Sequence, residues 1–101
     1  MRLIILSFLI LLLFSCTKTE VKDSEPPSTK QEAMDIYKDA LSSMEAGQYL
    51  IASEKFDQSE SLLPQTEWAA KSALMSSYCL YTISFYDEAI LNLKRFKKLY
   101  P

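Results

Sequence analysis

Residues 32–64 read EAMDIYKDALSSMEAGQYLIASEKFDQSESLLP, and residues 69–101 repeat this pattern as AAKSALMSSYCLYTISFYDEAILNLKRFKKLYP. When the two stretches are aligned with a shift of 37 residues, five positions are identical, and large and small side chains recur in the same order. The identical pairs are Ala33 and Ala70, Tyr49 and Tyr86, Ala52 and Ala89, Leu62 and Leu99, and Pro64 and Pro101. An internal repeat of this length is typical of stacked helical hairpins.

Each copy contains the pattern of two amphipathic helices. In the first copy, residues 33, 36, 37, 40, 41 and 44 are apolar or small and recur with helical spacing, so they form one stripe. Gly47, the only glycine of the chain, suits the left-handed residue that closes a helix, and Pro64 ends the next helix. The sequence therefore predicts an all-α fold, a short α-solenoid of two stacked hairpins over residues 30–64 and 65–101.

Residues 1–15 form a separate segment. Met1 and Arg2 give it a positive start, and residues 3–14 are apolar except for Ser7. An apolar run of this length is too short to span a bilayer of about 30 Å as a mature helix. The pattern is typical of a secretory signal peptide.

Residues 13–16, Leu-Phe-Ser-Cys, resemble the lipobox of bacterial lipoproteins. The resemblance implies that the Cys16 thiol receives diacylglycerol and that Cys16 becomes the N-terminus, where several acyl chains would hold the protein on a membrane. An ordinary signal peptide with an incidental cysteine, or an uncleaved anchor, is the alternative. In such lipoproteins an aspartate after the cysteine favours retention in the inner membrane. Because Thr17 stands there, we expect the outer membrane.

Residues 16–29 are predicted to form the lipidated cysteine and a flexible tether. The tether mixes Thr, Lys, Glu, Asp, Ser and Pro with a single valine, so it buries too little apolar area to offset its ordering entropy. Thr29, with Glu32 three residues later, fits a capping box at the start of the first helix.

The residue types argue against an enzyme. The chain has no histidine, which removes the usual general base and the commonest metal ligand. Its carboxylates are spread along helix surfaces, and if Cys16 carries lipid, Cys79 has no second cysteine to pair with. We therefore expect no catalytic residue, no cofactor and no metal. Nucleic acid is not expected as a partner of an exported chain with a pI of about 5.1.

Charge is distributed unevenly between the two copies. Three lysines meet seven acidic residues over residues 30–64, whereas five basic residues meet three acidic ones over residues 65–101. Four of the basic residues lie together in the last predicted helix, at Lys94, Arg95, Lys97 and Lys98. Cations near a helix C-terminus complement the helix dipole and keep the outer face solvated. A docking surface for an acidic partner is the alternative interpretation.

The residue order within the first copy resembles a tetratricopeptide repeat (TPR). Small residues at Ala40 and Ala52 surround Gly47 and Tyr49, and Phe56 follows before the final proline. The second copy keeps this order but has Ser84 where the glycine would be. We expect Ser84, together with Asp87, to cap the following helix.

The chain as a whole is similar to the N-terminal part of the BamD family, the TPR lipoproteins of the outer-membrane β-barrel assembly machinery. The similarity covers most of residues 33–101 and includes the leader that ends at Cys16. The segments that carry it are Ile36-Tyr37, Gly47-Gln48-Tyr49, Thr66-Glu67-Trp68-Ala69, Leu74-Met75 and Tyr86-Asp87-Glu88-Ala89. Because this family carries about five such repeats, we expect the chain to be cut short after two.

The resemblance implies a non-catalytic scaffold that is lipid-anchored on the periplasmic face of the outer membrane and has three kinds of partner. These are a BamA-like barrel-forming subunit and other subunits of the machinery, unfolded outer-membrane proteins, and the membrane through a lipid anchor. The family is thought to bind the barrel-forming subunit mainly through later repeats and to receive the C-terminal signal of its clients in a groove of the early repeats. Only the second task falls within these residues.

A peptide-binding groove is expected on the concave side of the stack. There the first helix of each hairpin presents the side chains that do not pack against the second helix, and an extended peptide would find apolar walls and tyrosine hydroxyls. Packing of one repeat on the next is the alternative role for each residue. The predicted groove residues are Tyr37, Leu41, Met44, Leu74, Tyr78 and Tyr81.

Two other functions remain open from the sequence. One is another TPR lipoprotein of the outer membrane, such as a pilotin that escorts secretins. The other is the helical arm of a cell-wall-degrading enzyme, which would require a catalytic domain. Since a solenoid generally needs three repeats to bury a continuous core, we also expect marginal stability and an exposed apolar face on the last helix, around Ile90, Leu93 and Phe96.

Overall fold

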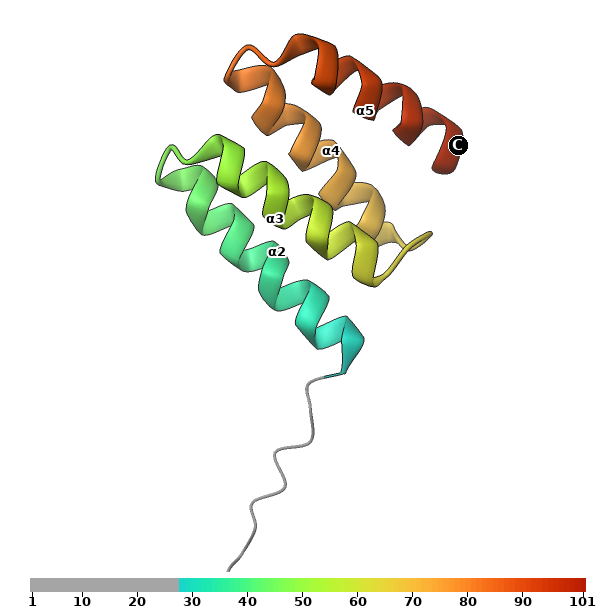
Figure 1. Ribbon diagram of the computed structural model, residues 1–101. Coiled ribbons are helices and arrows are strands. Elements are labelled where there is room, and N and C mark those ends of the chain that lie inside the picture. The colour runs from blue at the N-terminus through green and yellow to red at the C-terminus, as the bar shows by residue number, and fades with distance from the viewer. Residues whose placement is uncertain (1–27) are drawn as a thin grey trace, which may run out of the picture.

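The structure, a computed structural model, describes residues 28–101 and contains four α-helices in that range. They are α2 (Thr29–Glu45), α3 (Tyr49–Leu62), α4 (Glu67–Thr82) and α5 (Tyr86–Leu99). Each helix lies beside the next in chain order, and α4 also touches α2, so the two hairpins form one ladder with α5 at its end (Figure 1). The predicted all-α fold of stacked hairpins is confirmed. The predicted signal peptide, Cys16 and the tether up to residue 27 lie outside the described residues.

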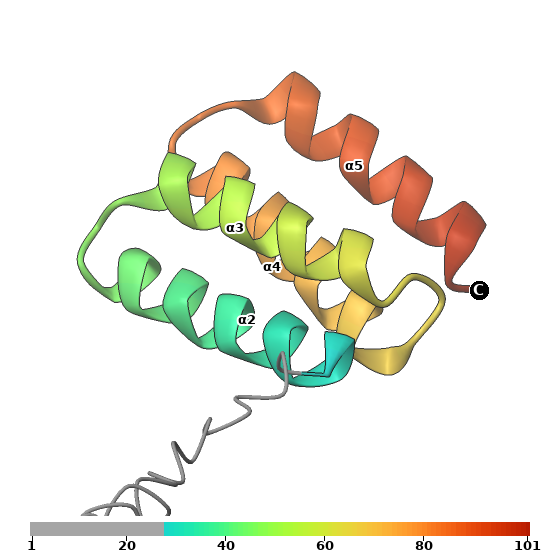
Figure 2. The same cartoon turned by 60° about the horizontal axis from the view of Figure 1, so that its bottom comes forward.

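The hairpins α2–α3 and α4–α5 occupy the two stretches in which the sequence repeats. A second view shows that consecutive helices run in opposite directions (Figure 2). Among the described residues, no helix combines the length and the apolar character that a membrane crossing needs.

The start of α2 differs from the predicted capping box. Ser28, not Thr29, is the N-cap residue, and its hydroxyl accepts a hydrogen bond of 3.2 Å from the backbone N–H of Gln31. Both residues are good caps, and a one-residue shift is within the usual uncertainty of a helix start. At α4, the Thr66 hydroxyl accepts from the N–H of Ala69 in the same way.

The two turns within the hairpins have the same backbone shape with different residues. Gly47 has φ = 78°, as predicted for the residue that closes the first helix, and Ser84 at the equivalent position has φ = 67°. The prediction that Ser84 caps the next helix is wrong, because the N-cap of α5 is Phe85 and no side chain caps it. Ser84 instead adopts the left-handed conformation that glycine adopts without steric cost.

We therefore expect Ser84→Gly to stabilise the protein by about 1 kcal/mol, since it relieves a left-handed non-glycine residue. At the equivalent turn of the first hairpin, Gly47→Ala should lower the free energy of unfolding by about 1 kcal/mol. A Cβ there meets open space, so only the backbone angle is unfavourable. Urea denaturation of both variants measures the effect. A stability loss in Ser84→Gly would show that the serine side chain holds the turn.

The core lies where α4 closes over the first hairpin. Phe56, Ala40, Ala52 and Cys79 are fully buried and form one cluster. Five partly buried side chains pack around this cluster: Tyr37, Leu41, Met44, Tyr49 and Met75. This cluster therefore joins α2, α3 and α4, while Ala89, the buried residue of α5, lies outside it.

Small hydroxyl residues line the contact between α3 and α4. The Oγ atoms of Ser53 and Ser76 lie 3.0 Å apart, and Ser72 donates to Ser59 at 3.4 Å. Ser59 in turn donates to the carbonyl of Ala33 on α2 at 2.8 Å. Small side chains let the helices approach closely, and each buried hydroxyl has a partner, as a buried polar group requires.

Candidate functional site

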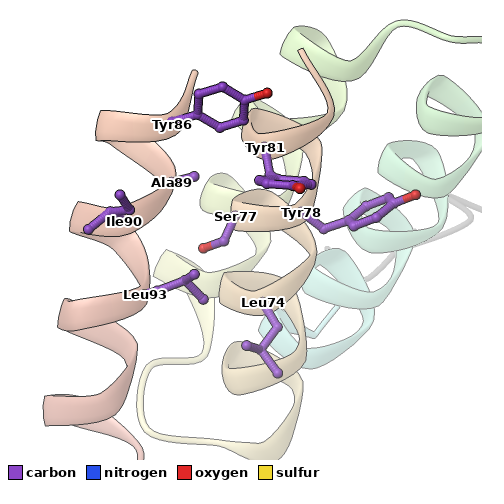
Figure 3. Close-up of a pocket in the computed structure, with 8 residues that line it drawn as sticks. All are labelled: Leu74, Ser77, Tyr78, Tyr81, Tyr86, Ala89, Ile90 and Leu93. Atoms are coloured by element: carbon purple, nitrogen blue, oxygen red, sulfur yellow. The ribbon is translucent and has the colours of Figure 1, made fainter. Parts of the chain in front are cut away.

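An open groove of about 520 Å³ lies between α4 and α5. Four residues of each helix line it, and in both helices they follow the spacing i, i+3, i+4, i+7, which places them on one face. We call it the α4–α5 groove (Figure 3). Its lining residues are Leu74, Ser77, Tyr78, Tyr81, Tyr86, Ala89, Ile90 and Leu93.

The groove has a small-residue floor and large apolar walls. Ser77 and Ala89 are buried beneath it, and Leu93 of α5 points across toward α4 (Figure 3). The rings of Tyr81 and Tyr86 lie 5.4 Å apart at one end. The Ser77 hydroxyl in the floor donates to the carbonyl of Ala73 at 3.0 Å, so the floor offers mainly shape and apolar contact.

Large side chains remain exposed around this groove. Tyr81 is 62% exposed, Tyr78 53% and Ile90 51%. Scattered exposed apolar residues are normal, whereas a contiguous patch of them indicates an interaction surface. The prediction of an exposed apolar face on the last helix is met by Ile90 and Leu93, while Phe96 is half-buried.

The six residues predicted to form a peptide groove fall into two groups. Leu74, Tyr78 and Tyr81 line the α4–α5 groove. The other three, Tyr37, Leu41 and Met44, pack against the buried core instead. The structure therefore does not bring the six together in one groove. A role in peptide binding stays a prediction.

The expectation that the α2 residues do not pack against the second helix is wrong. The ring of Tyr37 lies edge-on to Phe56 of α3, with ring centres 5.2 Å apart. It also meets Trp68 of α4 edge-on at 5.8 Å. The reason is that α4 closes over the first hairpin and converts its surface into core. Trp68 lies between the repeats, with Lys71 5.1 Å from its ring centre.

Sequence reasoning did not assign the α5 half of the groove. Tyr86, Ala89, Ile90 and Leu93 line it, although only the exposure of Ile90 and Leu93 is predicted above. The signal was present in the repeat itself. These four positions correspond, with the shift of 37 residues, to Tyr49, Ala52, Ser53 and Phe56, which are half-buried or buried in the first hairpin.

A partly buried ion pair ties α5 to α3. Arg95 donates two hydrogen bonds to the Glu60 carboxylate, of 2.7 and 2.8 Å, and the Tyr100 hydroxyl donates a third of 3.2 Å. Glu60 is only 7% exposed, and its hydrogen bond raises the pKa of the Arg95 guanidinium. Arg95 therefore has a structural role, while Lys94, Lys97 and Lys98 of the same helix are exposed.

The thiol of Cys79 is part of the core. It is fully buried and free, and burial, followed by the charge of Asp57, raises its pKa. A thiol of this kind is inert because the reactive thiolate is disfavoured. Among residues 28–101, no group of three or more carboxylate, cysteine or histidine side chains is arranged to hold a metal ion.

The family model YfiO, described as outer membrane lipoprotein, matches residues 29–101. The chain belongs to this family. The match begins at the first residue of α2 and continues to Pro101, so the four helices of residues 28–101 fall within it. Comparisons with curated proteins and with solved structures give no significant match. Membership supports an outer-membrane location and agrees with the TPR-type helical hairpins seen here.

Proposed function

We propose that the chain is a non-catalytic scaffold of the outer-membrane β-barrel assembly machinery, of the BamD type. It binds segments of unfolded outer-membrane proteins and a BamA-like barrel subunit. The α4–α5 groove is the observation that carries this proposal, because it presents a continuous apolar surface on a member of an outer-membrane lipoprotein family. The resemblance to the BamD family supports β-barrel assembly as the process in which the groove binds its ligand.

The groove suits the chemistry of unfolded β-barrel proteins. Their segments alternate apolar and polar side chains and are rich in aromatic residues. Leu74, Ile90 and Leu93 offer an apolar wall, and Tyr78 and Tyr81 add exposed rings. Aromatic residues combine large apolar contact area with a hydroxyl that remains available to the ligand backbone.

The lipid anchor belongs to the same proposal. Cys16 lies outside the described residues, and its modification is supported by the lipobox resemblance and by membership of a lipoprotein family. Cells grown with labelled palmitate should incorporate the label into the wild-type chain and lose it in Cys16→Ser. Equal labelling of both, or none in either, would contradict an anchor at this residue.

A pair of neighbouring substitutions tests the groove. Ile90 lines it, whereas Leu91 lies outside it, and both side chains are at least half exposed. We expect Ile90→Glu to weaken binding of a peptide from the C-terminus of an outer-membrane protein at least tenfold, because the carboxylate must be desolvated against the apolar wall. Leu91→Glu serves as the matched control and should bind as the wild type does.

Fluorescence anisotropy with a labelled client peptide measures both affinities. Copurification of the wild-type chain with a BamA-like subunit should accompany peptide binding. Equal affinity of Ile90→Glu and Leu91→Glu for the peptide would mean that the client binds outside the α4–α5 groove. Copurification with a secretin in place of the barrel subunit would favour the pilotin function.

A further inference from the structure

A second pocket, of about 460 Å³, lies between α3 and α5. Polar and charged side chains of both helices line it, and we call it the α3–α5 pocket. Its α5 wall includes Asn92, Arg95 and Leu99, which lie on the opposite side of α5 from the residues of the α4–α5 groove. The α3–α5 pocket is therefore formed where the two repeats meet, and it is separate from the groove.

The two walls of this pocket match level by level. Consecutive helices run in opposite directions, so α3 and α5 run in the same direction. Glu60 and Arg95, which are 35 residues apart, are joined across the pocket. Asp57 and Asn92 have the same separation and also line the pocket, one helical turn earlier. They form the next level, with a carboxylate on α3 and an amide on α5.

The cation of the pocket is already bound. Arg95 donates hydrogen bonds of 2.7 and 2.8 Å to the two carboxylate oxygens of Glu60, and the Tyr100 hydroxyl donates a third of 3.2 Å. An anionic ligand would find this guanidinium neutralised and would meet the carboxylates of Asp57 and Glu60. The charges of the pocket therefore disfavour an anion.

Asp57 carries the charge that the pocket leaves unbalanced. No ion pair among residues 28–101 includes this carboxylate. Burial raises the pKa of the Asp57 carboxyl, the Ser76 hydroxyl of α4 lowers it in part, and Glu60 and Arg95 act in opposite directions. The fold thus holds a carboxylate whose charged form it disfavours, and such groups cluster at functional sites.

The groups around Asp57 suit an arginine side chain better than a metal ion. In the part of the chain that the structure describes, no three carboxylate, cysteine or histidine side chains are arranged around one ion. Asp57 and Asn92 offer acceptor oxygens on opposite walls, which match the planar set of donors of a guanidinium group. One to two turns further along, Pro64 and Leu99 offer apolar surface to the methylene groups of such a side chain.

We propose that the α3–α5 pocket binds an arginine side chain of a partner polypeptide. The guanidinium group donates to the Asp57 carboxylate and to the amide oxygen of Asn92, and charge complementarity selects it. The pocket is open along the seam between α3 and α5, so the backbone of the partner stays outside it. None of these residues lines the α4–α5 groove, so the arginine site does not depend on the proposed function.

Nuclear magnetic resonance of the full 101-residue chain in nanodiscs tests this site. The probe is acetyl-argininamide, which mimics an arginine residue within a polypeptide. We expect it to shift the side-chain amide signals of Asn92 with a dissociation constant in the millimolar range. Asp57→Asn should weaken this binding at least tenfold, because an amide lacks the charge of the carboxylate. Asp87→Asn, which changes an exposed carboxylate outside the pocket, is the matched control and should bind as the wild type does.

Urea denaturation separates binding from folding in these variants. Because the fold disfavours the charge of Asp57, we expect Asp57→Asn to unfold at a urea concentration no lower than the wild type. Unfolding of this variant at a lower concentration would give the carboxylate a structural role and overturn the proposal.

Three further probes decide the class of ligand. Acetyl-glutaminamide, which is neutral, should cause no shift, and an equal shift would overturn the proposal. Equal affinity for acetyl-lysinamide would show selection for charge alone and overturn the assignment to arginine. Binding of free arginine without binding of acetyl-argininamide would assign the pocket to a small molecule and also overturn it. Arginine binding in a chain that binds no client peptide would contradict only the proposed function.

Discussion

Replacing Phe56 by alanine should remove most of the protein's free energy of unfolding. The ring is fully buried, packs edge-on against Tyr37 and belongs to the cluster that joins α2, α3 and α4. Removing a buried phenylalanine side chain costs about 4 kcal/mol. A domain of this size has about 5 kcal/mol of stability or less to lose. Circular dichroism during urea denaturation measures the loss of unfolding free energy.

Leu93 provides the matched control for this change. It holds the position of Phe56 in the second repeat but is 41% exposed. We expect Leu93→Ala to cost about 1 kcal/mol, since little apolar area returns to water. Similar losses of unfolding free energy in Phe56→Ala and Leu93→Ala would mean that Leu93 in the α4–α5 groove is covered as fully as Phe56 is in the first hairpin.

The second large effect is expected from Arg95→Ala. This change leaves the Glu60 carboxylate in a site that is 7% exposed, with only the Tyr100 hydroxyl as a partner. Breaking a buried ion pair costs about 3–5 kcal/mol. Because 42% of the Arg95 side chain is exposed, solvent screens part of the interaction, and we expect about 2 kcal/mol.

A double-mutant cycle separates this ion pair from other roles of Arg95. The variant with both Glu60→Ala and Arg95→Ala should be less destabilised than the sum of the single changes, since no unpaired charge remains. Lys94→Ala, next to Arg95 on an exposed position of α5, should change stability by less than about 0.5 kcal/mol. Simple additivity in the cycle would show that the ion pair does not stabilise the fold.

Much of the architecture follows from the repeat. The helical spacing of apolar residues and the turn at Gly47 predict the first hairpin, and the shift of 37 residues predicts a second hairpin of the same shape. The same comparison explains Ser84, which takes the backbone conformation of Gly47 without being a glycine. Sequence favours a cap at that serine because its hydroxyl is a good acceptor, whereas the repeat geometry requires a left-handed residue.

The candidate site could be predicted only in part. Periodicity shows which side of a helix is apolar, but does not show which neighbour covers that side. Tyr37 and Leu74 occupy equivalent positions in the two repeats, so their sequence context suggests the same role. In the structure α4 packs over Tyr37, while Leu74 remains 43% exposed. The difference arises from position in the stack, which is a property of the assembled helices.

Amide hydrogen exchange of α5, with and without a probe peptide from the C-terminus of an outer-membrane protein, tests directly whether the α4–α5 groove is open and binds a client segment. In the free chain, the amides of α5 should exchange at least tenfold faster than those of α3, because α3 packs between α2 and α4, whereas α5 packs along α4 and reaches α3 through the Arg95–Glu60 ion pair. Saturating probe should slow exchange in α5 and leave α3 unchanged. Protection of α5 equal to that of α3 in the free chain, and unaffected by the probe, would contradict an open binding groove between α4 and α5.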